Sequence, residues 1–174
     1  MKAVRALAVA LLVLLASSSC GEPTKPQSPA LPTPDASLIG SLLGPTGLLK
    51  CSDLPYASST QTIGIAGGSI SAGPHTLVIP PGALAQPTTI TMTAPTGLGV
   101  NAVTFQPAGL RFQIPAALTM SYANCSLLGL LLPKHIAYTT DNLDILYYLL
   151  GVTNVLNSTI TSKINHFSDY VVAW

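Results

Sequence analysis

The chain has 174 residues, a formal net charge of +1 and only 7% charged residues, whereas charged residues make up about 25% of an average soluble domain. Nucleic-acid binding depends on a basic patch, which so few scattered cations cannot form, and the composition therefore excludes that class of function. This length suits one modest domain with short additional segments.

The first twenty residues have the pattern of an export signal. Lys2 and Arg5 precede an apolar run over residues 6–16, which three serines and Cys20 follow. A basic start and an apolar run too short to span a membrane predict a signal peptide over residues 1–19. Cys20 after small residues resembles the signal of bacterial lipoproteins, in which this thiol is acylated. We therefore expect an extracytoplasmic protein, anchored in the bacterial cell envelope through an N-terminal lipid; ordinary cleavage, which would release a soluble secreted protein, is the alternative.

Two short segments separate this signal from the rest of the chain. Residues 20–35 hold five prolines among small polar residues, and such a linker adopts an extended, semi-rigid geometry. Residues 36–60 form an apolar connecting segment that is broken by Gly44-Pro45. An amphipathic helix lying on a bilayer is one interpretation of this segment. A helix on a bilayer needs several cations beside its apolar face, however, and Lys50 is the one Lys or Arg of this segment, which favours a short turn against the domain.

The cysteine count supports an oxidising compartment. With Cys20 acylated, Cys51 and Cys125 remain as a pair, and we expect a disulfide between them, with two buried free thiols as the alternative. Closing so long a loop would stabilise the fold by about 4 kcal/mol. Two cysteines without a histidine at ligand spacing are too few for zinc, so no metal or cofactor is expected.

From residue 61 to residue 174 the chain consists of short β-type runs separated by glycine and proline. Residues 67–84 predict two strands joined by a turn at Gly73-Pro74 and closed by Pro80-Pro81-Gly82, because proline ends a strand and glycine permits the sharp corner. The second of these strands, around Val78, is expected to be buried on both faces. Many short strands with frequent turns predict an all-β fold, an antiparallel β-sandwich over residues 61–174. The expected strands are 62–66, 69–72, 75–79, 88–93, 102–106, 110–113, 117–122, 135–140, 145–149, 157–164 and 167–174.

Several of these stretches together resemble a known family. They are Gly67-Gly68, residues 78–84 (VIPPGAL), residues 88–91 (TTIT), residues 105–112 (FQPAGLRF) and Pro115. In this combination they resemble the ZU-five domain, the β-sandwich module of ankyrins, netrin receptors and tight-junction scaffolds. The resemblance implies a non-enzymatic module that contacts a protein partner, which it does not identify. It implies no small-molecule substrate.

The tripeptide His166-Phe167-Ser168 is the one motif with a specific chemistry. Some relatives of the ZU-five domain, in death-domain adaptors and inflammasome sensors, cut their own chain between Phe and Ser at a similar tripeptide. The resemblance implies an N→O acyl shift, in which the Ser168 hydroxyl attacks the Phe167 carbonyl and water resolves the ester; His166 either takes the proton of the hydroxyl or strains the peptide bond. The structural interpretation places Phe167 in the core and its neighbours by strand alternation. Self-cleavage is therefore an alternative to the non-enzymatic role.

A carbohydrate-binding module is the third interpretation. It requires a row of exposed aromatic rings on one sheet face, although aromatic residues in strands more often pack in the core or across strands. The candidates for this row are Tyr138, Tyr147, Tyr148, Tyr170 and Trp174. Two lone histidines, His75 and His135, begin expected strands, and this position favours a structural hydrogen bond over metal binding.

Overall fold

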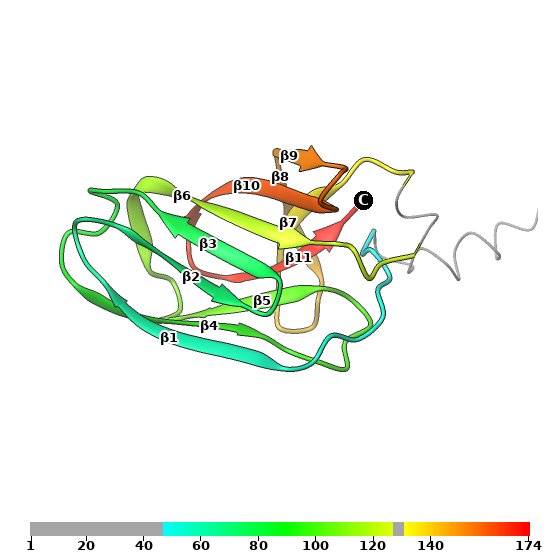
Figure 1. Ribbon diagram of the computed structural model, residues 1–174, viewed down its shortest axis with the longest axis horizontal. Coiled ribbons are helices and arrows are strands. Elements are labelled where there is room, and N and C mark those ends of the chain that lie inside the picture. Colours follow the sequence, from blue (N-terminus) through cyan, green and yellow to red (C-terminus); the bar gives the residue numbers. More distant parts are fainter. Residues whose placement is uncertain (1–46, 127–130) are drawn as a thin grey trace, which may run out of the picture. The chain divides into compact units, whose positions relative to one another are not determined.

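A computed structural model of the protein describes residues 47–126 and 131–174. The predicted signal peptide, Cys20 and the proline-rich linker lie outside these residues. The described part is all-β, without a helix, and Figure 1 shows its strands in two facing layers. The strands are β1 (Ala57–Ile63), β2 (Gly68–Ala72), β3 (His75–Ile79), β4 (Thr88–Ala94), β5 (Ala102–Gln106), β6 (Arg111–Ser121), β7 (His135–Thr139), β8 (Ile145–Leu149), β9 (Gly151–Asn154), β10 (Thr159–His166) and β11 (Asp169–Ala173).

The two layers are antiparallel sheets packed on each other, so the predicted β-sandwich is confirmed. One sheet has the order β1-β4-β5-β11-β7-β8, and the other has the order β2-β3-β6-β10-β9. Alternate side chains of both sheets fill the space between them, as the period of a strand requires. The largest fully buried side chains include Tyr170, Phe167, Leu77, Ile90, Met92, Leu118, Met120 and Ile160.

The predicted hairpin over residues 67–84 is present as β2 and β3. Gly73 turns the chain with a φ of +56°, and Gly82 has a φ of +77° at the Pro-Pro-Gly corner, both in the left-handed region that glycine tolerates best. The expectation that β3 is buried on both faces is wrong. Its burial alternates, and Val78 is 47% exposed, because only one face of this sheet packs against the other layer.

Strand β6 differs from the two strands predicted over residues 110–122, because it runs without a break through Pro115. Its ladder with β10 covers Ala116 to Ser121 and resumes only at Arg111, across an irregularity between Ile164 and His166. Pro115 lies in the interval without ladder pairs and is exposed. Its missing N–H group therefore breaks no cross-strand hydrogen bond.

The chain between Gly47 and Cys51 is part of the sandwich. Leu48 forms a bridge with Ala173, and the N–H group of Leu49 donates to Val172 O at 3.1 Å. Leu49 is buried in the main core, whereas Leu48 joins a second, smaller apolar cluster. These residues of the segment 36–60 lie against the domain, as expected, but as an extended stretch with two β-bridges and not as a turn. In the described part of the chain, no helix has the length and apolar character needed to cross a membrane.

Cys51 and Cys125 form a disulfide, which confirms that prediction. The two residues are 74 positions apart and also form an isolated β-bridge. The cross-link thus joins the entry segment to the loop that follows β6. It closes a long loop, which limits the freedom of the unfolded chain and stabilises the fold by about 4 kcal/mol.

Candidate interaction surface and the His166–Ser168 turn

Strands β8 and β9 each form one edge of a sheet, and β1 and β2 form the opposite edges. β8 ends the six-stranded sheet, β9 ends the five-stranded sheet, and only Leu150 separates them in the chain. Strand β8 pairs with β7, and β9 pairs with β10. The chain therefore passes at Leu150 from the edge of one layer to the edge of the other, on the side of the sandwich opposite β1 and β2 (Figure 1).

This edge is apolar and exposed. Leu150 is 91% exposed, Val152 is 78% exposed and Leu156 is 97% exposed. Tyr148 pairs with Ala137 and Val152 pairs with Thr161, so the exposed side chains lie on the outer sides of two different sheets. They surround the edge and do not form one flat patch. We call this set of seven large apolar side chains the β8–β9 surface: Leu146, Tyr147, Tyr148, Leu150, Val152, Val155 and Leu156.

Strands β8 and β9 carry no charged residue of their own, although Lys163 of β10 lies beside Leu150 and Val152. Neither a charged residue nor a proline occurs between residues 145 and 162. Natural sheets usually shield a free edge with charges, prolines or bulges, because unpaired backbone groups there recruit other strands. The pairing of β7 with β8 does contain one register shift, but β9 pairs regularly with β10. The edge of β9 is therefore open to another strand.

Gly151 explains how β9 reaches its place. A Cβ atom at this position would lie 2.5 Å from Ser162 Oγ and 3.0 Å from the side chain of Ile160. Only glycine lets the chain approach β10 so closely, directly after it has crossed from β8. A shallow depression of about 280 Å³ lies beside this contact, lined by Leu150, Gly151, Val152, Thr161, Ser162 and Lys163.

The exposed tyrosines do not form a row on one face. Tyr147 is paired with Tyr138, with ring centroids 6.2 Å apart, whereas the Tyr148 ring contacts His135 with centroids 5.7 Å apart. Consecutive residues of a strand point to opposite faces, so the two exposed rings cannot stack on one flat sugar surface. The other three candidates are buried or half-buried: Tyr138, Tyr170 and Trp174.

The second candidate site is the turn from β10 to β11. Phe167 is anchored there in the core, because it is 2% exposed and its N–H group donates to Leu110 O at 2.8 Å. Its ring stacks on Phe105 with centroids 4.7 Å apart and meets the edge of Phe112 at 5.2 Å. The structural interpretation of Phe167 is therefore correct. Ser168, which follows it, is half-buried.

His166 faces the carbonyl that the serine would attack. Its Nδ1 atom lies 3.2 Å from Phe167 O, and the hydroxyl of Tyr170 donates to His166 O at 2.6 Å. A proton on Nδ1 would stabilise negative charge on the Phe167 oxygen. Among the described residues, no hydrogen bond joins the Ser168 hydroxyl to the His166 ring. Of the two roles expected for His166, this contact with the Phe167 carbonyl agrees with an action on the peptide bond and not with the role of base to Ser168.

Beside this turn lies an acidic pair that sequence reasoning missed. Burial, followed by a hydrogen bond and charge repulsion from Asp141, raises the pKa of the Asp169 carboxyl. The two residues are far apart in sequence, and the register that pairs Asp169 with Thr139 brings them together. Sequence spacing carries no signal for such a contact, since it depends on the order of strands in the sheet.

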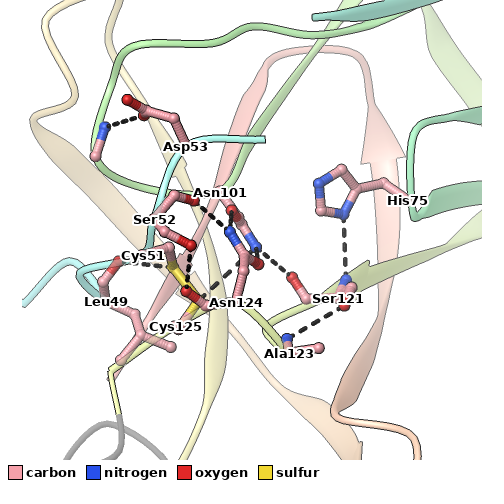
Figure 2. Close-up of a disulfide and its surroundings, with 11 residues drawn as sticks. Leu49, Cys51, Ser52, Asp53, His75, Asn101, Ser121, Ala123, Asn124 and Cys125 are labelled. Carbon is pink, nitrogen blue, oxygen red and sulfur yellow. Dashed lines mark hydrogen bonds between the residues drawn. A yellow bond between two sulfur atoms is a disulfide. The ribbon is translucent and has the colours of Figure 1, made fainter. Parts of the chain in front are cut away.

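The polar residues around the disulfide form a structural network (Figure 2). Asn101 Nδ2 donates to Ser121 O at 2.7 Å and to Asn124 Oδ1 at 2.7 Å, and Asn124 Nδ2 donates to Asn101 Oδ1 at 3.0 Å. The N–H group of Ser121 donates to Nδ1 of His75 at 3.1 Å. Burial lowers the pKa of His75 to about 4, so this histidine is a neutral, structural hydrogen-bond acceptor.

In the ranges 47–126 and 131–174, no group of three or more His, Cys, Asp or Glu residues lies close enough together to hold a metal ion.

Comparison with known proteins assigns no family. No model of a known protein family matches the chain, and no curated protein matches it. The resemblance to the ZU-five domain therefore stays a prediction from the residues.

Proposed function

We propose that the protein is a non-enzymatic, lipid-anchored module of the bacterial cell envelope, which makes protein contacts through the β8–β9 surface. The observation that carries this proposal is the exposure of seven large apolar side chains along the edge strands β8 and β9, at Leu150 between them and in the turn after β9. Burying one such side chain contributes about 1.5–3 kcal/mol. Exposure of all seven side chains to water is unfavourable, and a partner that covers them would gain the free energy of burying them.

The form of the surface favours a protein partner. A free strand edge offers backbone donors and acceptors, and an added strand satisfies them while its side chains meet the neighbouring apolar residues. Two tyrosines lie among the seven apolar side chains, and tyrosine is a residue type that dominates the binding energy of many interfaces. The surface therefore combines backbone recognition with apolar contact area.

The location in the envelope rests on the N-terminal pattern and on the disulfide. Disulfides persist in oxidising compartments outside the cytoplasm, and the bond between Cys51 and Cys125 is consistent with export. Acylation of Cys20 and a spacer over residues 20–35 would hold the sandwich outside the membrane. A ZU-five-like identity of the sandwich agrees with a contact module and belongs to the same proposal.

The proposed contact is tested with charge-introducing variants. Leu150→Lys combined with Val152→Lys places two cations on the edge and should remove at least nine-tenths of the protein adducts formed by chemical cross-linking in the intact envelope. Gln61→Lys combined with Ser69→Lys is the matched control on exposed positions of the edge strands β1 and β2, and it should leave the adducts unchanged. Equal adducts in both variants would contradict the proposal.

A second candidate function is self-cleavage between Phe167 and Ser168, which the contact of His166 Nδ1 with Phe167 O favours. In this reaction the Ser168 oxygen bonds to the Phe167 carbonyl carbon, the C–N bond breaks and the freed amine takes the proton. Water then hydrolyses the ester, which leaves a carboxylate on Phe167 and the hydroxyl on Ser168.

Mass spectrometry of the purified, denatured protein tests this second function. Cleavage would release the peptide of residues 168–174, and Ser168→Ala would abolish the release. An intact chain after days at neutral pH excludes self-cleavage and leaves the contact module unaffected.

A further inference from the structure

We propose that Tyr138 and Tyr147 form a site of oxidative modification, at which a one-electron oxidant joins the two phenol rings by a carbon–carbon bond. The two residues are directly opposite each other in the antiparallel pair of β7 and β8. Their ring centroids are 6.2 Å apart, and the ring planes differ by 33°. The modification is a covalent cross-link between neighbouring strands, and it does not depend on the proposed protein contact.

The pair lies where a dissolved oxidant reaches it. Tyr147 is 61% exposed on the edge strand, and Tyr138 beside it is half-buried. On its other sides the Tyr138 ring is held by the core, because it is paired across the strands with Tyr170 and its centroid lies 5.5 Å from that of the His166 ring, at an interplanar angle of 81°. The more exposed Tyr147 ring is therefore the one that is free to make the last approach.

The coupling takes two electrons and two protons from the chain. Each phenol loses one electron and one proton, which leaves a phenoxyl radical on each ring. The two radicals combine through ring carbons next to the hydroxyl groups, and the hydrogens on these carbons leave as protons while both oxygens are protonated again. A haem peroxidase with hydrogen peroxide is the class of oxidant that accepts the electrons, since one peroxide molecule is reduced to two waters. Because the fold already holds the rings together, no encounter between chains is needed.

The fold selects this pair among the tyrosines. All six tyrosines lie in the described ranges, and within these ranges Tyr138 and Tyr147 are the two tyrosines whose rings contact each other. Tyr170 is 1% exposed and thus shielded from the oxidant. Tyr148 follows Tyr147 in the chain but points to the opposite face, where its ring contacts His135. Coupling within one chain should therefore join Tyr138 to Tyr147.

The cross-link would fasten an edge strand. Among the described strands, β8 pairs only with β7, and this pairing contains a register shift between Tyr138 and Thr139. Local opening of such an edge exposes its backbone amides to exchange with water. A bond between the two rings closes the short loop from β7 to β8 and keeps the strands together. Amide hydrogen exchange in β8 should become at least tenfold slower after the coupling.

Peroxidase treatment followed by peptide mapping tests the proposal. The purified full-length chain, in dilute detergent solution, is treated with a haem peroxidase and hydrogen peroxide. An endoproteinase that cleaves before aspartate then cuts at Asp141 and Asp144, which separates Tyr138 from Tyr147. We expect dityrosine fluorescence and a linked pair of peptides that is lighter than their sum by two hydrogen atoms. Fragmentation of this pair in the mass spectrometer should place the bond between Tyr138 and Tyr147.

Two variants make the result specific. Tyr147→Phe keeps the ring but lacks the hydroxyl group that must lose its hydrogen, and it should remove at least nine-tenths of the linked peptides. Tyr148→Phe is the matched control, because Tyr148 is the next residue and is 42% exposed but faces the other side of the sheet, and it should leave the yield unchanged. Formation of the Cys51–Cys125 disulfide in both variants, read by mass spectrometry, verifies the fold.

Three outcomes would overturn the proposal. They are a linkage through Tyr148, a linkage found only between separate chains, and coupling of free tyrosine in the same solution without any linkage in the folded chain. None of them touches the proposed contact module, which is read from the protein adducts of the intact envelope.

Discussion

His166 Nδ1 lies 3.2 Å from the carbonyl oxygen of Phe167, the next residue in the chain. This contact is possible because the Phe167 ring is fixed between Phe105 and Phe112 and its N–H group is bonded to Leu110 O. The core thus fixes the backbone between β10 and β11, and this backbone orients the His166 ring. Core packing and the one chemically distinctive motif depend on the same side chain.

Phe167→Ala should lower the free energy of unfolding by about 3–5 kcal/mol, the usual cost of a cavity left by a buried phenylalanine. Urea denaturation measures this change. Tyr56→Ala is the control, because Tyr56 is an aromatic residue with 64% exposure, and it should change stability by less than about 0.5 kcal/mol. Similar losses in the two variants would contradict the anchoring of the turn by the core.

The stability of the protein should fall as the pH decreases from 6.5 towards 4. His75 is neutral in the fold, where burial lowers its pKa to about 4, whereas the unfolded chain has the usual value of 6.5. Its contribution is therefore complete above pH 6.5 and is lost as the pH falls, at a cost of up to about 3 kcal/mol. His75→Asn keeps an acceptor for the Ser121 N–H group but does not titrate. Thermal unfolding of this variant should lack the loss between pH 6.5 and pH 4.

Ionisation of Asp169 should lower the stability of the protein as the pH rises, which is the opposite of the effect of His75. Burial and the neighbouring Asp141 raise the pKa of Asp169 above its usual 3.8, so the folded protein holds this proton more tightly than the unfolded chain. Its stabilising effect is present below pH 3.8 and is lost as the pH rises. At pH 7, Asp169→Asn should therefore stabilise the protein, by up to about 1 kcal/mol for so exposed a pair. A gain that persists unchanged at pH 3 would contradict this assignment.

Gly151→Ala should destabilise the edge of the five-stranded sheet by about 1–3 kcal/mol, because the added methyl group meets Ser162 Oγ at 2.5 Å. Gly64→Ala is the control, since its nearest neighbour lies at 3.8 Å. Ser162 Oγ is buried without a hydrogen-bond partner, so Ser162→Ala should cost little and should partly rescue Gly151→Ala. Hydrogen exchange at Val152 and Thr153 would localise the effect to β9.

The strands that the sequence predicts well are those whose local pattern agrees with their place in the fold. β3, β5 and β8 have the predicted bounds, because turn residues border short β-type runs in each. β1 begins at Ala57, before the expected strand over residues 62–66. Its polar residues lack a β-type pattern, and cross-strand hydroxyl pairs such as Thr60 with Thr91 hold it to β4. β9 was not predicted because it has only four residues, GVTN, of which glycine and asparagine are rare in strands.

The amino-acid sequence alone determined the fold class and most strand positions, since glycine, proline and alternation act within a few residues of one another, and its cysteine count predicted the disulfide. Only the tertiary structure decided which strands lie at the edges, and with them the β8–β9 surface and the Asp141–Asp169 pair. An apolar side chain has the same pattern in a sequence whether a neighbouring sheet covers it or not. Exposure of Leu150 and Val152 follows from the order of strands, and that order is set by contacts between residues far apart in the chain.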